Sequence, residues 1–287
     1  MFFVAGITGN VGGATARQLL DKGHRVRALV RDPVKASQWS QEGVEIVQGD
    51  FKDANAVAAA LQGVEGAYLM LPPYLGQDAA YTETKAMIAS FREALQKTPP
   101  PRLVLLSSIG SDRESGVGPI TQTHLLEEAM ADLPFPIAYI RAAAFVENYM
   151  YALKAAASTG YLDTFWTPTD RPVPVIGTVD IGREVARLLI GGWSGKKIVE
   201  LGTRTSADDL ARALSQVLGR SVQARAVPRE QWTEAFRAIG LPPNGIAAYT
   251  EMVDGCNSGW IDFGAPGAEL APATTTPEEV FAQVMKK

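Results

Sequence analysis

Three glycines spaced three residues apart near the N-terminus constrain the fold of this chain more than any other feature. Residues 6–12 read Gly-Ile-Thr-Gly-Asn-Val-Gly, after an apolar run that begins at Phe2 and before a helical pattern over 11–22. Such glycines allow a tight turn, a close approach of the backbone to a pyrophosphate and close strand–helix packing, and a helix N-terminus attracts anions. The motif predicts a dinucleotide-binding loop, with a purely structural turn as the alternative. The expected contacts are Gly6, Thr8, Gly9, Asn10, Val11 and Gly12.

The first half of the chain alternates short apolar runs with helical patterns. Further strands are predicted at residues 25–30, 44–47, 66–71, 103–106 and 137–140, and helices at 32–41, 53–61, 79–97 and 121–132. This alternation is typical of βαβ units that build a parallel sheet. The fold class predicted is therefore α/β, with a Rossmann-type doubly wound parallel sheet and a dinucleotide-binding domain over residues 1–148.

The regular alternation ends after about residue 148. A proline-rich stretch at 164–174 reads as a loop, and further helices are predicted at 179–190, 208–218, 229–239 and 277–285. We expect residues 149–287 to form a smaller C-terminal α/β substrate lobe. The helix near 178–192 is the exception, because it is expected to return to the first domain.

Composition narrows the function classes. The net charge is −4 and no long Lys/Arg run is present, which disfavours nucleic acid as a partner. One cysteine, Cys256, and two histidines cannot supply an internal disulfide or a typical metal site. No apolar stretch approaches the ~20 residues of a membrane span. We expect a cytoplasmic monomer or homodimer that acts on a small molecule, without metal, membrane or nucleic acid.

The residues after the second predicted strand indicate which dinucleotide binds. An acidic residue there binds the ribose of NAD, whereas an arginine suits the 2′-phosphate of NADP. Asp32 is explained as the N-cap before Pro33. Arg31 has no such local explanation, and its guanidinium can grip a phosphate, with help from Lys35. NADPH is therefore the preferred cofactor and NADH a possible one, unless Arg31 is only a solvated surface charge.

Other strand ends should also reach the cofactor. Asp50 and Phe51 follow the third strand, where a carboxylate can accept from the adenine amine and a ring can pack against it. Leu71 and Pro72 lie at the end of the fourth strand, and Ser107 ends the fifth. For Asp50 and Ser107 the alternative is a simple turn-capping role.

Several of these segments resemble a known family. The loop at 6–12 is similar to the Gly-Ala-Thr-Gly-x-x-Gly loop of the NmrA-like family of atypical short-chain dehydrogenases/reductases. Further similar segments are Leu-Val-Arg-Asp-Pro at 29–33, Gln-Gly-Asp-Phe at 48–51, His124 with Glu127, Tyr-Ile-Arg at 139–141 and Phe-x-Glu-Asn at 145–148. The tail, with Gly-Leu-Pro at 240–242 and Thr-Thr-Thr-Pro at 274–277, is similar to the NADPH:quinone reductase and triphenylmethane reductase branches.

The resemblance implies an NAD(P)-binding fold with a substrate cleft between two lobes. Some relatives transfer a hydride from NADPH to a quinone-like or dye-like acceptor, which makes an NADPH-dependent reductase the first expectation. Other relatives act as non-catalytic NADP(H)-binding redox sensors, and this is the alternative. A sugar-nucleotide epimerase or dehydratase ranks last, because that chemistry depends on a tyrosine base.

The proton donor is the least defined part of the expected site. Typical short-chain dehydrogenases carry Tyr-x-x-x-Lys on the helix after the fifth strand. Here that spacing occurs only at Tyr81 and Lys85, one helix too early, which suggests a coincidental surface pair. The expected helix instead holds His124, whose ordinary pKa is close to neutral. His124 is the predicted proton donor, with a structural hydrogen bond at the helix start as the alternative.

The acceptor is expected to lie against aromatic side chains. Protonation of a reduced quinone can come from solvent, so catalysis requires mainly that a flat acceptor be held against the nicotinamide. Tyr74 and Phe145 are the predicted substrate contacts. Asn148 is expected to orient a carbonyl group.

Overall fold

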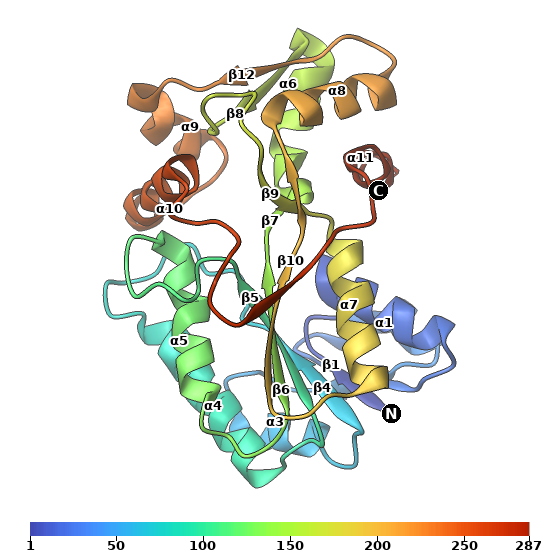
Figure 1. Cartoon of the computed structure of the whole chain (residues 1–287). Helices are drawn as coiled ribbons and strands as arrows, with labels where there is room; N and C mark the ends of the chain where they lie inside the picture. Colours follow the sequence, from blue (N-terminus) through green and yellow to red (C-terminus); the bar gives the residue numbers. More distant parts are fainter. Residues whose placement is uncertain (287) are drawn as a thin grey trace.

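The computed structural model describes residues 1–286 and centres on an eight-stranded sheet (Figure 1). The strand order is β13-β10-β6-β5-β4-β1-β2-β3, and every neighbouring pair is parallel. The strands are β1 (Phe2–Val4), β2 (Val26–Val30), β3 (Glu45–Gln48), β4 (Gly66–Leu69), β5 (Leu103–Ser108), β6 (Ile137–Ala142), β10 (Lys196–Leu201) and β13 (Ala268–Ala271). The predicted parallel sheet is confirmed.

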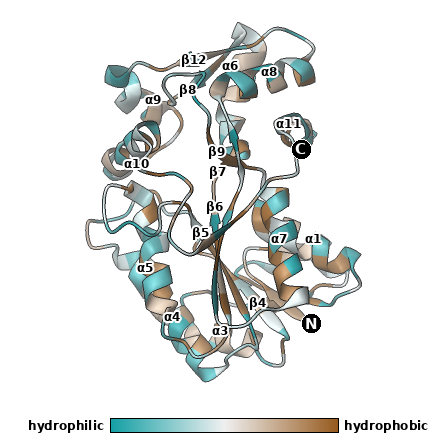
Figure 2. Cartoon of the chain, viewed as in Figure 1, coloured by the Kyte–Doolittle hydropathy of each residue, from teal (hydrophilic) through white to brown (hydrophobic). Residues whose placement is uncertain are grey.

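Helices cover both faces of this sheet, so the predicted doubly wound arrangement is also confirmed. One face carries α1 (Asn10–Asp21) and α7 (Thr178–Gly191), and the other carries α3 (Ala54–Ala60), α4 (Thr82–Lys97) and α5 (Thr121–Met130). Successive side chains of a strand point to opposite faces of the sheet, so they enter the hydrophobic cores on its two sides in turn. Phe2 and Val4 pack with α1 and α7, whereas Phe3 packs with α3 and α4. Figure 2 shows the hydrophobic residues gathered along the sheet.

The predicted helix starts are confirmed at two aspartates. The Asp32 carboxylate accepts a hydrogen bond from the backbone N–H of Val34 at 3.0 Å. It begins a 3-10 turn, η1 (Pro33–Ala36), which leads into α2 (Ser37–Gln41), so the single helix expected here is divided in two. Asp53 accepts from the N–H groups of Asn55 and Ala56 at the start of α3. Both caps satisfy N–H groups that a helix leaves unpaired.

Two strands of the large sheet come from the second half of the chain. β10 pairs with β6, and β13 extends the sheet beyond β10. Neither strand was predicted, because β10 begins with two lysines and β13 is a short Ala-Glu-Leu-Ala segment. α7 packs directly on α1, where a Cβ on Gly182 would lie 2.6 Å from the Cβ of Ala14. The division of the chain at residue 148 stays a prediction.

The remaining elements form a smaller α/β lobe beyond the carboxyl ends of the sheet strands (Figure 1). Its strands are β7 (Ala144–Phe145), β9 (Val173–Ile176) and β11 (Thr203–Thr205) in one sheet, and β8 (Tyr161–Thr164) and β12 (Gln223–Ala226) in another. Its helices are α6 (Met150–Thr159), α8 (Ala207–Leu218), α9 (Trp232–Ala238), α10 (Ile246–Ser258) and α11 (Pro277–Val284), with short turns η3 (Val146–Tyr149), η4 (Arg229–Gln231) and η5 (Pro243–Gly245). The expected smaller lobe is thus present. No helix among residues 1–286 has the length and apolar character needed to cross a membrane.

Candidate cofactor and substrate site

The glycine motif forms a tight loop between β1 and α1. Gly6 has a φ of +64°, a conformation that side chains other than glycine rarely adopt, and its carbonyl accepts from the N–H of Gly9 at 2.9 Å. A Cβ on Gly12 would lie 2.2 Å from the Gly6 carbonyl oxygen and 2.5 Å from that of Ala5. The chain therefore needs glycine at both ends of the loop for α1 to begin so close to β1.

The start of α1 offers an environment suited to an anion. Gly9 is the N-cap, no side chain caps the helix, and its first turn contains no acidic residue. The first turn of α1 therefore brings no negative charge of its own to the positive end of the helix dipole. Together with the glycine cradle at Gly12, this arrangement fits the diphosphate of a dinucleotide.

Two free cations lie at the carboxyl end of β2. Arg31 and Lys35 are exposed, and neither side chain has a hydrogen-bond or ion-pair partner within residues 1–286. The neighbouring Asp32 carboxylate is engaged as the cap of η1. Within the described residues, two cationic side chains are therefore available at this edge of the sheet, as the prediction of a 2′-phosphate contact requires.

Asp50 and Phe51 both have structural roles. Asp50 accepts from the N–H of Lys52 at 2.9 Å, the turn-capping alternative raised from the sequence. The Phe51 ring meets Phe91 of α4 edge-to-face, with the ring centroids 5.7 Å apart. Neither residue lines the large pocket described below. Their predicted contacts with a cofactor stay predictions.

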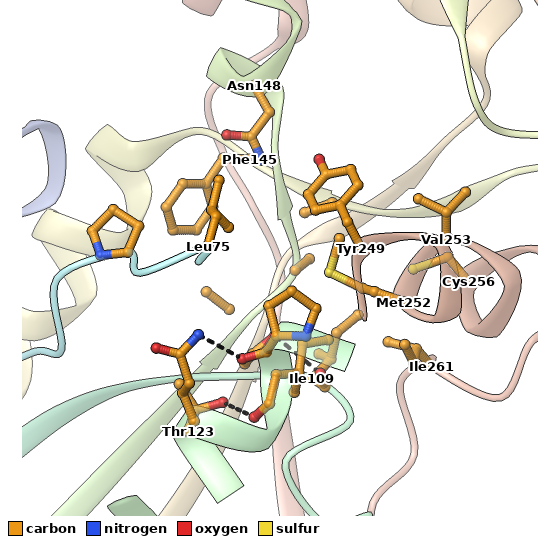
Figure 3. A pocket seen from close by; sticks show the side chains of 18 of the residues that line it. Leu75, Ile109, Thr123, Phe145, Asn148, Tyr249, Met252, Val253, Cys256 and Ile261 are labelled. Carbon is orange, nitrogen blue, oxygen red and sulfur yellow. Dashed lines mark hydrogen bonds between the residues drawn. The ribbon is translucent and has the colours of Figure 1, made fainter. Parts of the chain in front are cut away.

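A pocket of about 520 Å³ lies between the sheet edge and the smaller lobe (Figure 3). Six of the predicted site residues line it: Leu71, Pro72, Ser107, Tyr74, Phe145 and Asn148. The first three come from the ends of β4 and β5, and Phe145 and Asn148 come from β7 and η3. The fold thus brings residues predicted to contact the cofactor and residues predicted to contact the substrate into one cavity.

The pocket lining is largely apolar. No Asp, Glu, His, Lys or Arg side chain is among its lining residues in the described part of the chain. Apolar and aromatic groups from both lobes form most of its surface, among them Ile109, Phe165 and Trp166. Cavities of this size and character suit organic ligands with few polar groups.

One wall of the pocket comes from α10, which the sequence analysis missed. Tyr249, Met252, Val253 and Cys256 project from one side of this helix into the lining. Their spacing of three, four and seven residues is the signal that would have identified both the helix and its inward face. Burial raises the pKa of the Cys256 thiol to about 11, so this side chain stays protonated in the pocket at neutral pH.

A buried ion pair supports the floor of the pocket. Arg141 of β6 donates to Glu127 of α5 through Nε at 3.0 Å and through Nη2 at 2.6 Å. Ser107 donates to the same Glu127 carboxylate and also lies 3.0 Å from the hydroxyl of Ser111. Ser107 is 4% exposed. These contacts fix its hydroxyl, and they give a structural role to two residues of the family-like motifs.

Glu147 and Asn148 are adjacent in sequence but act in different places. Glu147 accepts from the backbone N–H of Thr178 at 2.8 Å and from its hydroxyl at 2.6 Å, so it caps the start of α7. Asn148 is exposed and lines the pocket. Only Asn148 is therefore placed to meet a ligand there.

His124 does not reach the pocket. Its Nδ1 lies 2.8 Å from the carbonyl oxygen of Ser111, and its Nε2 lies 3.5 Å from the Glu128 carboxylate. The neighbouring Thr123 lines the cavity, whereas His124 does not. Tyr81 and Lys85 are absent from the lining as well. The catalytic role predicted for His124 stays a prediction, and this position favours its structural alternative.

Comparison of the sequence with known proteins identifies the family and several related enzymes. The family model for the NmrA-like family matches residues 2–275. Quinone oxidoreductase 2 of Escherichia coli is 24% identical over 251 residues, which cover 86% of this chain and 84% of that protein. The NAD(P)H azoreductase of Xenophilus azovorans is 25% identical over 257 residues, covering 88% and 86%.

Solved structures share the fold over the whole chain. The Escherichia coli quinone oxidoreductase QOR2 in complex with NADPH has a TM-score of 0.80 at 23% identity and covers 99% of this chain and 100% of its own. The triphenylmethane reductase of Citrobacter sp. has a TM-score of 0.81 at 20% identity, covering 100% and 99%. Because the family model spans nearly all of the sequence, the chain belongs to the NmrA-like family.

Proposed function

We propose that this protein is an NADPH-dependent oxidoreductase that reduces flat, largely apolar acceptors of the quinone or dye type. The observation that carries the proposal is the pocket in which the carboxyl ends of β4 and β5 meet an apolar wall from the smaller lobe. The relatives named as a quinone oxidoreductase and an azoreductase support the same class of reaction.

The cofactor would be held by the loop at 6–12 and by the two cations after β2. Gly6, Gly9 and Gly12 allow the backbone to approach the diphosphate, and Arg31 with Lys35 would pair with the 2′-phosphate. Bound NADPH supplies the hydride. NADPH is favoured over NADH because the Arg31 guanidinium has no ion pair within residues 1–286 to break before it binds a phosphate.

The pocket would hold the acceptor and exclude water. Apolar side chains such as Phe145, Ile109 and Met252 can cover the faces of a planar ring, which favours a neutral or delocalised acceptor over a compact anion. Positioning of this kind accounts for much of the rate of a hydride transfer, since little other chemistry is required of the protein.

A redox sensor remains the second candidate, and one observation favours it. No side chain with an ordinary pKa near neutrality lines the pocket in the described residues. A protein that only binds NADP(H) needs no such acid. Reduction of a quinone does not need one either, because water can supply the proton, so we rank the reductase first.

Turnover and binding measurements separate the two candidates. We expect steady oxidation of NADPH when a benzoquinone or a triphenylmethane dye is added. The loss of the nicotinamide absorbance of NADPH measures this reaction. NADH should support a slower reaction at equal concentration. Tight NADPH binding without turnover on either acceptor would support the sensor instead, and failure to bind either dinucleotide would exclude both candidates.

The expected small-molecule partner follows from this proposal, while the monomeric or homodimeric state and the cytoplasmic location stay predictions.

A further inference from the structure

The polar groups of the pocket include four tyrosines, which differ in what their hydroxyls can do. The hydroxyl of Tyr149 is bonded to Thr164 at 2.8 Å. Tyr74 and Tyr151 lie at the surface, with 47% and 41% of their area exposed. Tyr249 is half-buried, which makes it the least exposed of the three tyrosines of the lining whose hydroxyls are not already engaged.

The hydroxyl of Tyr249 is free and open to the cavity. It has no hydrogen-bond partner within residues 1–286, and it is not among the fully buried atoms that lack one. Its ring packs edge-to-face against Phe236 with the centroids 5.0 Å apart, which fixes its direction. In Figure 3 the hydroxyl points toward the side of the pocket on which Asn148 lies.

Contacts with a turn of the large domain hold α10, and therefore Tyr249, in place. Glu251 accepts from the backbone N–H of Gly118 in the short turn η2 (Gly118–Ile120) at 3.0 Å. A Cβ on Gly118 would lie only 1.9 Å from the carbonyl oxygen of Ala248, so the two backbones are in direct contact. The residues on either side of Tyr249 thus join the smaller lobe to the large sheet.

The other enclosed hydroxyls of the lining direct their hydrogens at the protein. Ser107 donates to Glu127, Ser108 donates to the Ile109 carbonyl at 3.0 Å, and Thr123 donates to the Ile120 carbonyl at 2.8 Å. Each hydroxyl has a single hydrogen to donate. Among the hydroxyls of the lining that have no protein acceptor within residues 1–286, that of Tyr249 therefore belongs to the least exposed side chain.

We propose that the Tyr249 hydroxyl donates a hydrogen bond to the carbonyl oxygen of a quinone acceptor, a role that rests on the proposed function and deepens it. Addition of a hydride to a quinone places negative charge on an oxygen, and a proton from water then completes the hydroquinone. A donor already aimed at that oxygen stabilises the charge as it develops. Burial also raises the pKa of Tyr249, so the phenol keeps its own proton during this step.

The proposal predicts a different contribution of Tyr249 to the reduction of two kinds of acceptor. A triphenylmethane dye receives the hydride on its central carbon and its positive charge is cancelled, so no oxyanion forms. Such an acceptor gains nothing from a donor at Tyr249. The side chain should therefore matter for quinones and not for these dyes, although both occupy the same pocket.

The test is the variant Tyr249→Phe, measured with a benzoquinone and with a triphenylmethane dye at saturating NADPH. Phenylalanine keeps the contact with Phe236, so Tm should not change. We expect kcat/KM for the quinone to fall roughly 100-fold, the size of effect seen when an oxyanion donor is removed, and the value for the dye to stay within about twofold. Tyr161→Phe is the matched control, because Tyr161 is exposed on β8 and does not line the pocket.

Two results would overturn the role of Tyr249. One is unchanged quinone reduction in Tyr249→Phe, and the other is an equal loss on both acceptors, which would indicate a general packing effect. Failure of the proposed function looks different, because the wild-type protein would then reduce neither acceptor. Wild-type protein that reduces the dye and no quinone would retain the reductase and exclude this role.

Discussion

A Cβ atom on Gly12 would lie 2.2 Å from the carbonyl oxygen of Gly6, closer than any side chain can approach. The contact joins the second residue of the β1–α1 loop to the first turn of α1 and sets the shape of the loop between them. Since neither partner is the end of a flexible side chain, the clash can be relieved only by moving the backbone.

Gly12→Ala should therefore disrupt the loop that we assign to the dinucleotide. We expect binding of NADPH and NADH to be lost together and Tm to fall by roughly 5 °C. Fluorescence titration and thermal unfolding measure the two effects. Gly191→Ala is the control, because Gly191 ends α7 and a Cβ there would meet open space. This variant should bind both dinucleotides normally. Normal dinucleotide binding by Gly12→Ala would argue against this site.

Arg31→Ala tests how the protein distinguishes the two dinucleotides. Loss of a charge-assisted contact with the 2′-phosphate should weaken NADPH binding roughly 30-fold, about 2 kcal/mol, and leave NADH binding nearly unchanged. Arg25→Ala is a matched control, because Arg25 is also an exposed arginine and precedes the opposite end of β2. Equal losses for both dinucleotides would refute the assignment of Arg31.

His124 should stabilise the fold and not the reaction. Its Nδ1 meets the Ser111 carbonyl outside the pocket, so we expect His124→Ala to lower stability by about 1 kcal/mol and to leave kcat within about twofold. His124→Asn, whose amide can donate to the same carbonyl, should recover part of that stability. A large fall in kcat with normal NADPH binding and normal Tm would instead support the proton-donor role predicted from the sequence.

Asp180 should make stability depend on pH. Burial raises its pKa, but hydrogen bonds from the backbone and hydroxyls of Thr275 and Thr274 outweigh burial, so the pKa lies below its ordinary value. This stabilisation is complete above the pKa of an unfolded aspartate and is lost as pH falls through the lowered pKa. Asp180→Asn should cost about 2 kcal/mol in urea unfolding at neutral pH.

The difference between wild type and Asp180→Asn should shrink as the pH is lowered into the acid range. Asp170→Asn provides the control, because Asp170 is exposed and has no hydrogen-bond or ion-pair partner within residues 1–286. A constant difference at all pH values would show that the charge of Asp180 is not what holds the Thr274–Thr275 segment on α7.

The Cys256 thiol should react slowly although it lines the pocket. With its pKa raised to about 11 by burial, the thiol is largely protonated at pH 8 and only its minor thiolate form can react. Alkylation by iodoacetamide should therefore be far slower than for free cysteine and should accelerate as pH rises toward 11. Mass spectrometry follows the modification, and rapid labelling at pH 8 would contradict this environment.

Several features of the fold were determined by residues close together in the sequence. The loop at 6–12, the caps at Asp32 and Asp53 and the alternation of strands and helices depend on backbone conformations that a few neighbouring residues select. Such preferences can be read from the chain alone. They were enough to predict the parallel sheet and the glycine loop between β1 and α1, and to single out Arg31 and Lys35 after β2.

Only the tertiary structure decided which distant segments meet. β10 is a strand because β6 offers it an edge, and β13 is a strand because β10 offers it the next one; the composition of both segments gives a weak signal. Long-range packing also turned His124 toward Ser111 and brought Tyr249 of α10 opposite the ends of β4 and β5. Contacts between residues far apart in the chain depend on the packing of whole elements, and no local pattern encodes them.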